Sequence, residues 1–92
     1  MTVTIGHTTF DRVDYDADAD VLYLHVGDPS TATDFDESPE GHALRFDADG
    51  KLVGLTLLNA RDLLAGGKPM IVTIPERVVI DPAALAPAVH AA

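Results

Sequence analysis

The sequence contains no cysteine among its 92 residues. Disulfide bonds and thiolate-ligated metal sites are therefore excluded. It also lacks an apolar run long enough to cross a bilayer, and its first five residues have neither the basic start nor the apolar core of a signal peptide. From these absences we expect a cytoplasmic protein.

Basic residues are scarce as well. Six Lys and Arg residues stand against fifteen Asp and Glu residues, which gives a formal net charge of −9. Nucleic-acid affinity comes mainly from Lys and Arg side chains that displace counterions, so direct binding to nucleic acids or to anionic membranes is not expected. The cations are scattered along the sequence: Arg12, Arg45, Lys51, Arg61, Lys68 and Arg77. This charge favours a small basic protein or a divalent cation as partner, although acidic surfaces also simply keep small proteins soluble.

Length and patterning predict a single domain over residues 1–92, built on an antiparallel sheet. The chain is long enough for one modest core, and its composition is globular, with 47% hydrophobic and 23% charged residues. The hairpin with the strongest signal has the turn Ala48-Asp49-Gly50, where glycine can adopt a positive φ. Alternation and turn residues predict strands over residues 3–5, 10–15, 21–26, 31–37 (as an edge strand), 42–47 and 51–58.

The remainder of the chain predicts a short helix and a C-terminal extension. Asn59 is the expected N-cap of a helix near residues 60–65, which Gly66-Gly67 ends in a left-handed conformation. Residues 68–92 form an extension with strands at 70–74 and 77–80, and a final helical turn that begins at Asp81-Pro82 and runs to Pro87. The predicted fold class is α+β: a small antiparallel β-sheet domain built from hairpins, with one short helix and a strand and turn extension.

The apolar strands of this extension have two interpretations. They form an outer pair whose open edge favours a homodimer, or they complete the core of the domain itself. We favour the second. In both cases, removal of the chain after Gly67 is expected to destabilise the protein.

Several stretches resemble a known family of bacterial domains, domain of unknown function 2283. The resemblance covers about residues 10–65 and rests on the following sequences: Tyr15-Asp16, Ala19-Asp20, Leu22-Tyr23-Leu24, residues 41–54 and Leu57-Leu58-Asn59-Ala60. It implies a compact β-rich domain with a short helix and no established activity. Genes for such domains often lie beside small toxin-like ribonucleases, so the resemblance also implies an antitoxin-like or other partner-binding role.

The acidic turn after residue 15 is the first candidate site. Asp16, Asp18 and Asp20 have the initial spacing of a calcium-binding loop, but Val21 replaces its glycine and Gly27 its final glutamate. The turn is therefore interpreted as a structural one, because Asp side chains bond their own backbone in turns. Its outward carboxylates are predicted to contact a partner, with Tyr23 as the aromatic anchor.

Two histidines give an alternative site. His25 and His42 can approach each other if their strands pair, and with nearby carboxylates they would bind a metal ion or a small molecule. Neither histidine has the spacing of a zinc-binding helix, and the simpler interpretation is two polar residues on the outer face of a sheet.

No catalytic residue and no cofactor are predicted. The sequence has no Gly-x-Ser-x-Gly turn, and none of its fifteen acids stands out as an acid–base pair. The sequence therefore predicts a non-enzymatic interaction module that binds a small basic protein. The alternatives are the metal- or small-molecule-binding protein just described and a purely structural homodimer.

Overall fold

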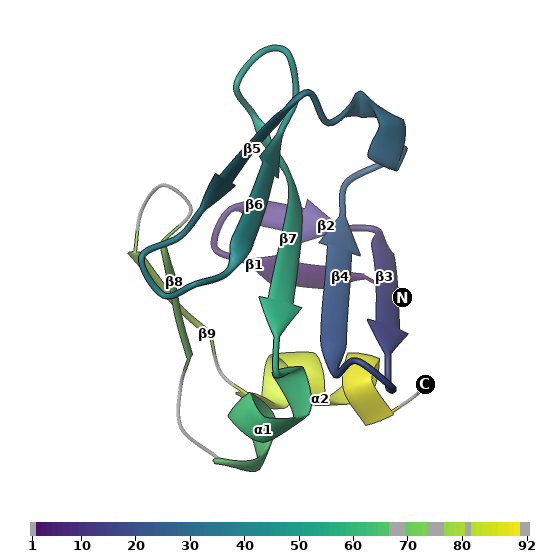
Figure 1. Cartoon of the computed structure of the whole chain (residues 1–92), viewed down its shortest axis with the longest axis vertical. Helices are drawn as coiled ribbons and strands as arrows, with labels where there is room; N and C mark the ends of the chain where they lie inside the picture. Colours follow the sequence, from purple (N-terminus) through teal and green to yellow (C-terminus); the bar gives the residue numbers. More distant parts are fainter. Residues whose placement is uncertain (1, 67–69, 74–76, 81, 91–92) are drawn as a thin grey trace.

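An antiparallel sheet of five strands forms the centre of the molecule (Figure 1). The computed structural model describes residues 2–66, 70–73, 77–80 and 82–90. The strand order is β3-β4-β7-β6-β5, and every neighbouring pair is antiparallel. The strands are β3 (Arg12–Asp16), β4 (Val21–His25), β5 (Asp34–Glu37), β6 (Ala43–Phe46) and β7 (Leu52–Leu58). The predicted α+β class is confirmed.

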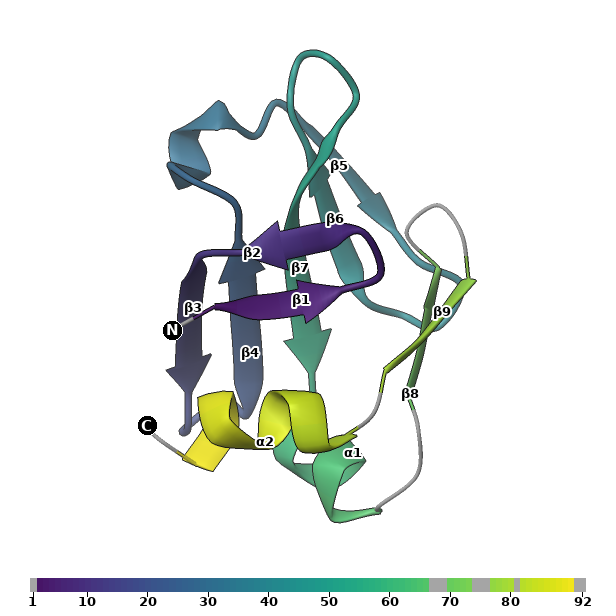
Figure 2. The same ribbon diagram turned by 180° about the vertical axis from the view of Figure 1, so that it is seen from behind.

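The other elements lie behind this sheet, below it and at its side. A hairpin of β1 (Val3–Ile5) and β2 (Thr8–Phe10) runs across one face, and α2 (Pro82–His90) lies below the hairpin on the same side (Figure 2). The short helix α1 (Ala60–Ala65) follows β7 at the lower end of the sheet. A separate strand pair, β8 (Met70–Thr73) and β9 (Arg77–Ile80), lies at the side of the five-stranded sheet. The short helix η1 (Pro29–Thr31) connects β4 to β5.

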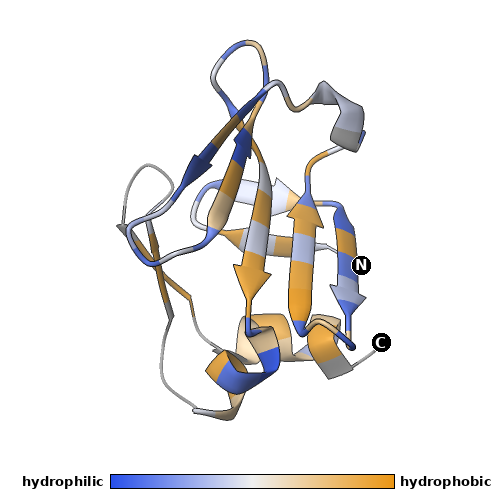
Figure 3. Cartoon of the chain, viewed as in Figure 1, coloured by the Kyte–Doolittle hydropathy of each residue, from blue (hydrophilic) through white to orange (hydrophobic). Residues whose placement is uncertain are grey.

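The core lies between the sheet and the hairpin with α2. Leu22 and Leu24 on β4 pair with Leu57 and Leu55 on β7, so four leucines share one face of the two central strands. Figure 3 shows these strands as largely hydrophobic and the edge strands β3 and β5 as mainly hydrophilic. The most deeply buried large side chains come from β2, β4, β7, β8 and α2: Phe10, Leu22, Leu24, Leu55, Leu57, Val72 and Leu85.

The opposite face of the five-stranded sheet carries no layer formed by the described residues (Figures 1 and 2). Side chains alternate between the two faces of a strand, so the residues between the buried leucines point to this side. Tyr23 and His25 of β4 and Thr56 of β7 are among them. We call this side the open face.

The predicted strand over residues 10–15 is wrong in one respect, because it is two strands in two sheets. The hairpin strand β2 ends at Phe10 and β3 begins at Arg12. Between them, the Asp11 carboxylate accepts a hydrogen bond from the backbone N–H of Gly27 at 2.8 Å. This contact joins residues far apart in the sequence, so the local pattern gave no sign of the break.

Asn59 is the N-cap residue of α1, as predicted, but its side chain does not cap the helix. Asn59 has a left-handed φ of 56° and makes no side-chain capping hydrogen bond. Instead, the Asp20 carboxylate accepts from the Arg61 N–H at 2.8 Å, and the Asp20 carbonyl accepts from the Ala60 N–H at 3.1 Å. At the other end, Gly66 has φ −67°, which is right-handed, and Gly67 lies outside the described residues.

The C-terminal extension completes the core, as favoured above. Val72 of β8 and Ile80 of β9 are buried, whereas Val79 on the opposite side of β9 is exposed. The predicted cap Asp81 lies outside the described residues, but the helix after it continues past Pro87 to His90. It is therefore longer than the predicted turn, because Ala88 and Val89 are also buried in the core. No helix among the described residues is long and apolar enough to span a membrane.

Candidate functional site

One row of paired residues crosses the open face and gathers its basic side chains. Arg12 pairs with His25, His25 with Gly54, Gly54 with Arg45, and Arg45 with Phe35. Residues directly opposite each other on antiparallel strands point to the same face. The row therefore places Arg12, His25 and Arg45 on one surface, with a glycine between the last two.

A cavity of about 290 Å³ opens along this row. Its size is close to the lower limit of small-molecule sites in proteins. Charged, aromatic and aliphatic residues from β3, β4, β6 and β7 line it: Arg12, Asp14, Tyr23, Leu24, His25, Arg45, Leu55 and Thr56.

Gly54 provides room at the centre of the row. Its φ lies outside the left-handed region, so its backbone conformation does not require glycine. A Cβ at this position would lie 3.0 Å from the Cβ of Arg45 and 3.1 Å from the Cδ2 of His25. Glycine in a strand interior weakens the strand and often marks a close approach. Here it allows the side chains of His25 and Arg45 to lie against the sheet.

His25 brings an unpartnered polar atom to the site. Its side chain is only 7% exposed, and its Nδ1 lies 3.3 Å from the Gly27 carbonyl oxygen. With a proton on Nδ1, the ring donates to that carbonyl, and this contact fixes its orientation. Nε2 is then left buried without a hydrogen-bond partner in the described chain. Because buried polar atoms are nearly always partnered, Nε2 is the unusual atom of this site.

The two arginines that line the cavity form no direct ion pair with a described acid, although backbone hydrogen bonds and, to a smaller extent, the charge of Arg12 lower the pKa of Asp11 and of Asp28 nearby. The Arg45 guanidinium lies over the Phe35 ring, 5.4 Å from its centroid. Neither Arg12 nor Arg45 forms a salt bridge with a carboxylate of the described residues. Guanidinium groups stay charged at all relevant pH values. The cavity therefore holds two permanent positive charges and a single carboxylate, that of Asp14.

The acids predicted as partner contacts are mostly engaged within the fold. The Asp16 carboxylate accepts from the backbone N–H groups of Asp18 and Ala19, at 3.1 and 3.2 Å. The Asp20 carboxylate accepts from the Tyr15 hydroxyl at 2.6 Å as well as from the Arg61 N–H. These hydrogen bonds, chiefly the one from Tyr15, lower the pKa of Asp20.

Of the three predicted acids, only Asp18 makes no side-chain hydrogen bond within the described chain. The predicted anchor Tyr23 is 43% exposed and lines the cavity beside His25. The structure thus places Tyr23 at the cavity, two residues along β4 from His25, and the acidic turn beyond the far end of that strand.

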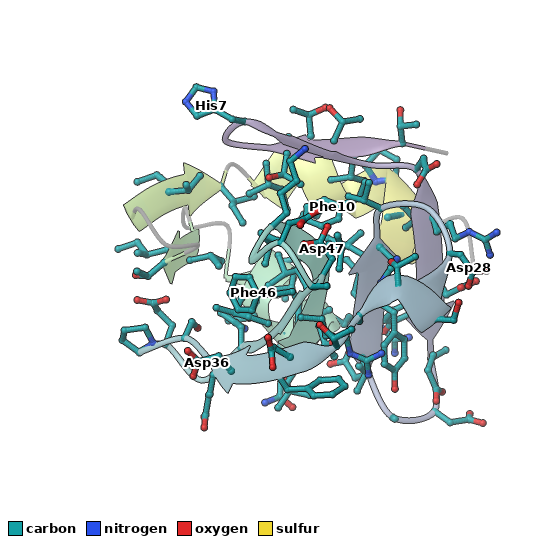
Figure 4. All side chains as sticks on the ribbon, turned by 90° about the horizontal axis from the view of Figure 1, so that it is seen from above. His7, Phe10, Asp28, Asp36, Phe46 and Asp47 are labelled. Atoms are coloured by element: carbon teal, nitrogen blue, oxygen red, sulfur yellow. The ribbon has the colours of Figure 1, made fainter. Side chains whose placement is uncertain are left out.

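The structure does not bring His25 and His42 together. Their strands do not pair, because β7 lies between β4 and β6, and the residue of β6 level with His25 is Arg45. His42 is buried beside the Ser38–Gly41 turn, and this burial lowers its pKa against the opposing effect of Glu40. His7 points away from the molecule at the tip of the β1–β2 hairpin (Figure 4). The described residues contain no group of three or more His, Asp and Glu that could hold a metal ion.

Sequence reasoning missed Arg12, Arg45 and Gly54 as parts of a site. The two arginines are far apart in the chain, and only the strand register places them in one row on the open face. One signal was present in the sequence: Gly54 lies in the interior of the largely apolar strand β7, where a glycine often marks close approach of other groups.

Comparison with known proteins supports the family resemblance. No curated protein and no solved structure matches the chain. The family described as protein of unknown function (DUF2283) matches residues 12–61, which is more than half of the chain. This region runs from β3 into α1. It contains every residue of the row on the open face: Arg12, His25, Gly54, Arg45 and Phe35. The chain therefore belongs to this family of proteins of unknown function.

Proposed function

We propose that this domain is a non-enzymatic protein-interaction module that binds a small basic protein on its open face. The observation that carries the proposal is the exposure of large apolar side chains on this face. Tyr23, Phe35 and Leu58 are 43%, 69% and 47% exposed. The solvent face of an antiparallel sheet is normally polar, and exposed apolar groups rimmed by polar ones are typical of interaction sites.

The acidic residues at the edges of the open face and the net charge of the chain support a basic partner. The register places Asp14 and Asp16 of β3 and Glu37 of β5 on this face, at its two edges. All four residues of β5 are exposed, and three of them are acidic. With a formal net charge of −9, the domain attracts a positively charged protein and accelerates its association.

Tyr23 is the best candidate for the anchor of this interface. It lies on a central strand of the sheet, between Asp14 on β3 and Thr56 on β7. Tyrosine is enriched among the residues that dominate binding energy near the centres of interfaces. An antitoxin-like role, in which the open face neutralises a small basic toxin, is one form of this function and agrees with the family resemblance.

Native mass spectrometry of the untagged protein, purified from its own host at low salt, tests the proposal. We expect a stoichiometric complex with a small basic protein. Tyr23→Ala and Leu58→Ala should each abolish or strongly weaken this complex, because both residues lie on the open face. The matched control is Val79→Ala, since Val79 is 62% exposed but lies on β9, outside the five-stranded sheet.

Two results would contradict the proposal. One is a homodimer or a bare chain with no bound protein. The other is a complex that the Val79 variant weakens as much as the Tyr23 variant does, which would place the interface elsewhere.

A further inference from the structure

We infer that the cavity beside His25 binds a small anionic molecule, whose carboxylate or phosphate group is held between the guanidinium groups of Arg12 and Arg45. The inference goes beyond the proposed function because it requires no protein partner. It rests on the charge of the cavity, on its geometry and on the unpartnered atom of His25.

The charge of the cavity is opposite to that of the molecule. Two of the six Lys and Arg residues of the chain line this one cavity, together with only one carboxylate. In a chain with fifteen acids, both arginines nevertheless remain without a salt bridge to the described residues. The planar donor groups of arginine match the oxygens of a carboxylate or phosphate in pairs. An external oxyanion therefore complements the two arginines within the cavity, where Asp14 is the one lining carboxylate.

The geometry allows both arginines to reach one ligand. Adjacent strands lie about 4.8 Å apart, so Arg12 on β3 and Arg45 on β6 start roughly 14 Å apart across three strand spacings. Both side chains nevertheless line the same cavity, with His25 and Gly54 between them in the row. A group of a few atoms in this cavity can thus be contacted by both arginines.

His25 supplies a third polar group. Because its Nδ1 contacts the Gly27 carbonyl, Nε2 is the ring nitrogen left to interact with a ligand. Nε2 can donate a hydrogen bond to an oxyanion when it carries a proton, and it can accept one from a protonated ligand oxygen when it does not. Binding therefore gives this buried atom the partner that it lacks among the described residues.

The next row along the sheet supports the rest of the ligand. Tyr23 and Thr56 pair with each other directly beside the basic row, and both line the cavity. The ring of Tyr23 offers a flat apolar surface, and the hydroxyl of Thr56 offers a donor and an acceptor. A molecule with a planar part next to its anionic group fits this arrangement.

An amide NMR titration of the full chain tests the inference, with inorganic phosphate and benzoate as separate probes and sodium chloride at matched ionic strength as the reference. We expect saturable shifts at Arg12, His25, Gly54 and Arg45 with at least one probe. Shifts with phosphate alone assign a phosphate ligand, and shifts with benzoate alone assign a planar carboxylate. The absence of saturable shifts with both probes would overturn the inference.

Matched variants separate a specific site from general attraction. Arg45→Gln should weaken binding by about tenfold or more, because it removes charge-assisted hydrogen bonds. Lys51→Gln removes the same charge from an exposed position outside the cavity and should leave the affinity nearly unchanged. Gly54→Ala, checked by thermal unfolding to be folded, should also weaken binding because its methyl group contacts His25 and Arg45.

Equal weakening by Arg45→Gln and Lys51→Gln would overturn the inference, because the anion would then respond only to overall charge. Failure of the anion-binding inference is distinguishable from failure of the proposed function. Anion binding is measured on the chain alone, whereas the partner complex is measured by mass spectrometry.

Discussion

At the scale of single residues, Asp20 shows how one carboxylate joins distant parts of the fold. It accepts hydrogen bonds from the Tyr15 hydroxyl on β3 and from the Arg61 N–H at the start of α1. Asp20 itself has a left-handed φ of 55°, which aspartate tolerates better than most residues. An acid that sequence reasoning assigned to a partner surface is therefore the cap of a helix.

Asp20→Asn is expected to lower the urea midpoint of unfolding at neutral pH. Asparagine retains the size of the side chain and its tolerance of a left-handed φ, but it loses the charge that strengthens both hydrogen bonds. The hydrogen bond from Tyr15 is the main reason that the folded-state pKa of Asp20 lies below its ordinary value of 3.8. The stabilisation of the fold by the charged Asp20 carboxylate is therefore fully present above pH 3.8 and is lost as the pH falls through the lower folded-state pKa.

Urea unfolding at neutral and acidic pH measures both effects. The difference between wild type and Asp20→Asn should shrink in acid. Asp18→Asn is the matched control, because it neutralises a neighbouring carboxylate that makes no side-chain hydrogen bond within the described chain. An equal loss of stability in both variants would show that the acidic turn acts only through its charge.

The residue scale also shows why the cavity could not be predicted. In the sequence the six cations are scattered, and no local pattern connects Arg12 with Arg45. Their proximity depends on the pairing of β3 with β4, of β4 with β7 and of β7 with β6. By contrast, the exposure of Tyr23 follows from simple alternation along β4, because Tyr23 lies on the face of the sheet away from the buried Leu22 and Leu24.

At the scale of secondary-structure elements, the strands and turns that depend on residues close together in the sequence were predicted best. The β6–β7 hairpin is an example: Gly50 has φ 79°, and the Asp47 carboxylate accepts from the N–H groups of Asp49 and Lys51, each at 2.9 Å. Features set by distant contacts were missed. The break at Asp11 depends on Gly27, and the cap of α1 depends on Asp20.

The C-terminal extension is an integral part of the fold, although the family match ends at residue 61. The Glu40 carboxylate, in the turn between β5 and β6, accepts from the N–H and the hydroxyl of Thr73 on β8, at 2.9 and 3.0 Å. From α2, Leu85, Ala88 and Val89 enter the hydrophobic core. The extension therefore covers surface that the matched region alone would expose to water.

Leu85→Ala is expected to reduce the free energy of unfolding by roughly 2–5 kcal/mol, the usual range when a buried leucine is truncated. Its side chain is only 1% exposed. Ala84→Gln, at an exposed position of the same helix, is the control and should change stability little, because glutamine is also a good helix former. Urea unfolding measures both.

A chain that ends at Gly67 should lose more stability still, and one as stable as the full chain would refute the role assigned to the extension.

At the scale of the whole molecule, the two faces of one sheet divide stability from interaction. Residues that alternate along β4 and β7 belong either to the leucine core or to the open face. A substitution on the open face, such as Tyr23→Ala, should therefore affect binding more than folding. The exposed acids of β5 also have a protective effect, because charges on an edge strand oppose its pairing with other chains.

The net charge of −9 leads to the last prediction, that salt stabilises this protein. No salt bridge links the side chains that the structure describes, so repulsion among the acids dominates its electrostatics. Raising sodium chloride from about 0.01 M to about 0.15 M shortens the screening length from about 30 Å to about 8 Å and should raise the melting temperature. A fall in melting temperature would instead mean that attractive charge pairs prevail.

Phosphate at the same ionic strength separates screening from specific binding. Chloride reports screening, and if phosphate is the anion bound in the cavity between Arg12 and Arg45, phosphate should add a further rise in melting temperature through its preference for the folded state. Arg45→Gln should remove this further rise and leave the chloride effect in place. If Arg45→Gln and wild type responded identically to a stabilising phosphate, the extra effect would have to arise at another position on the surface.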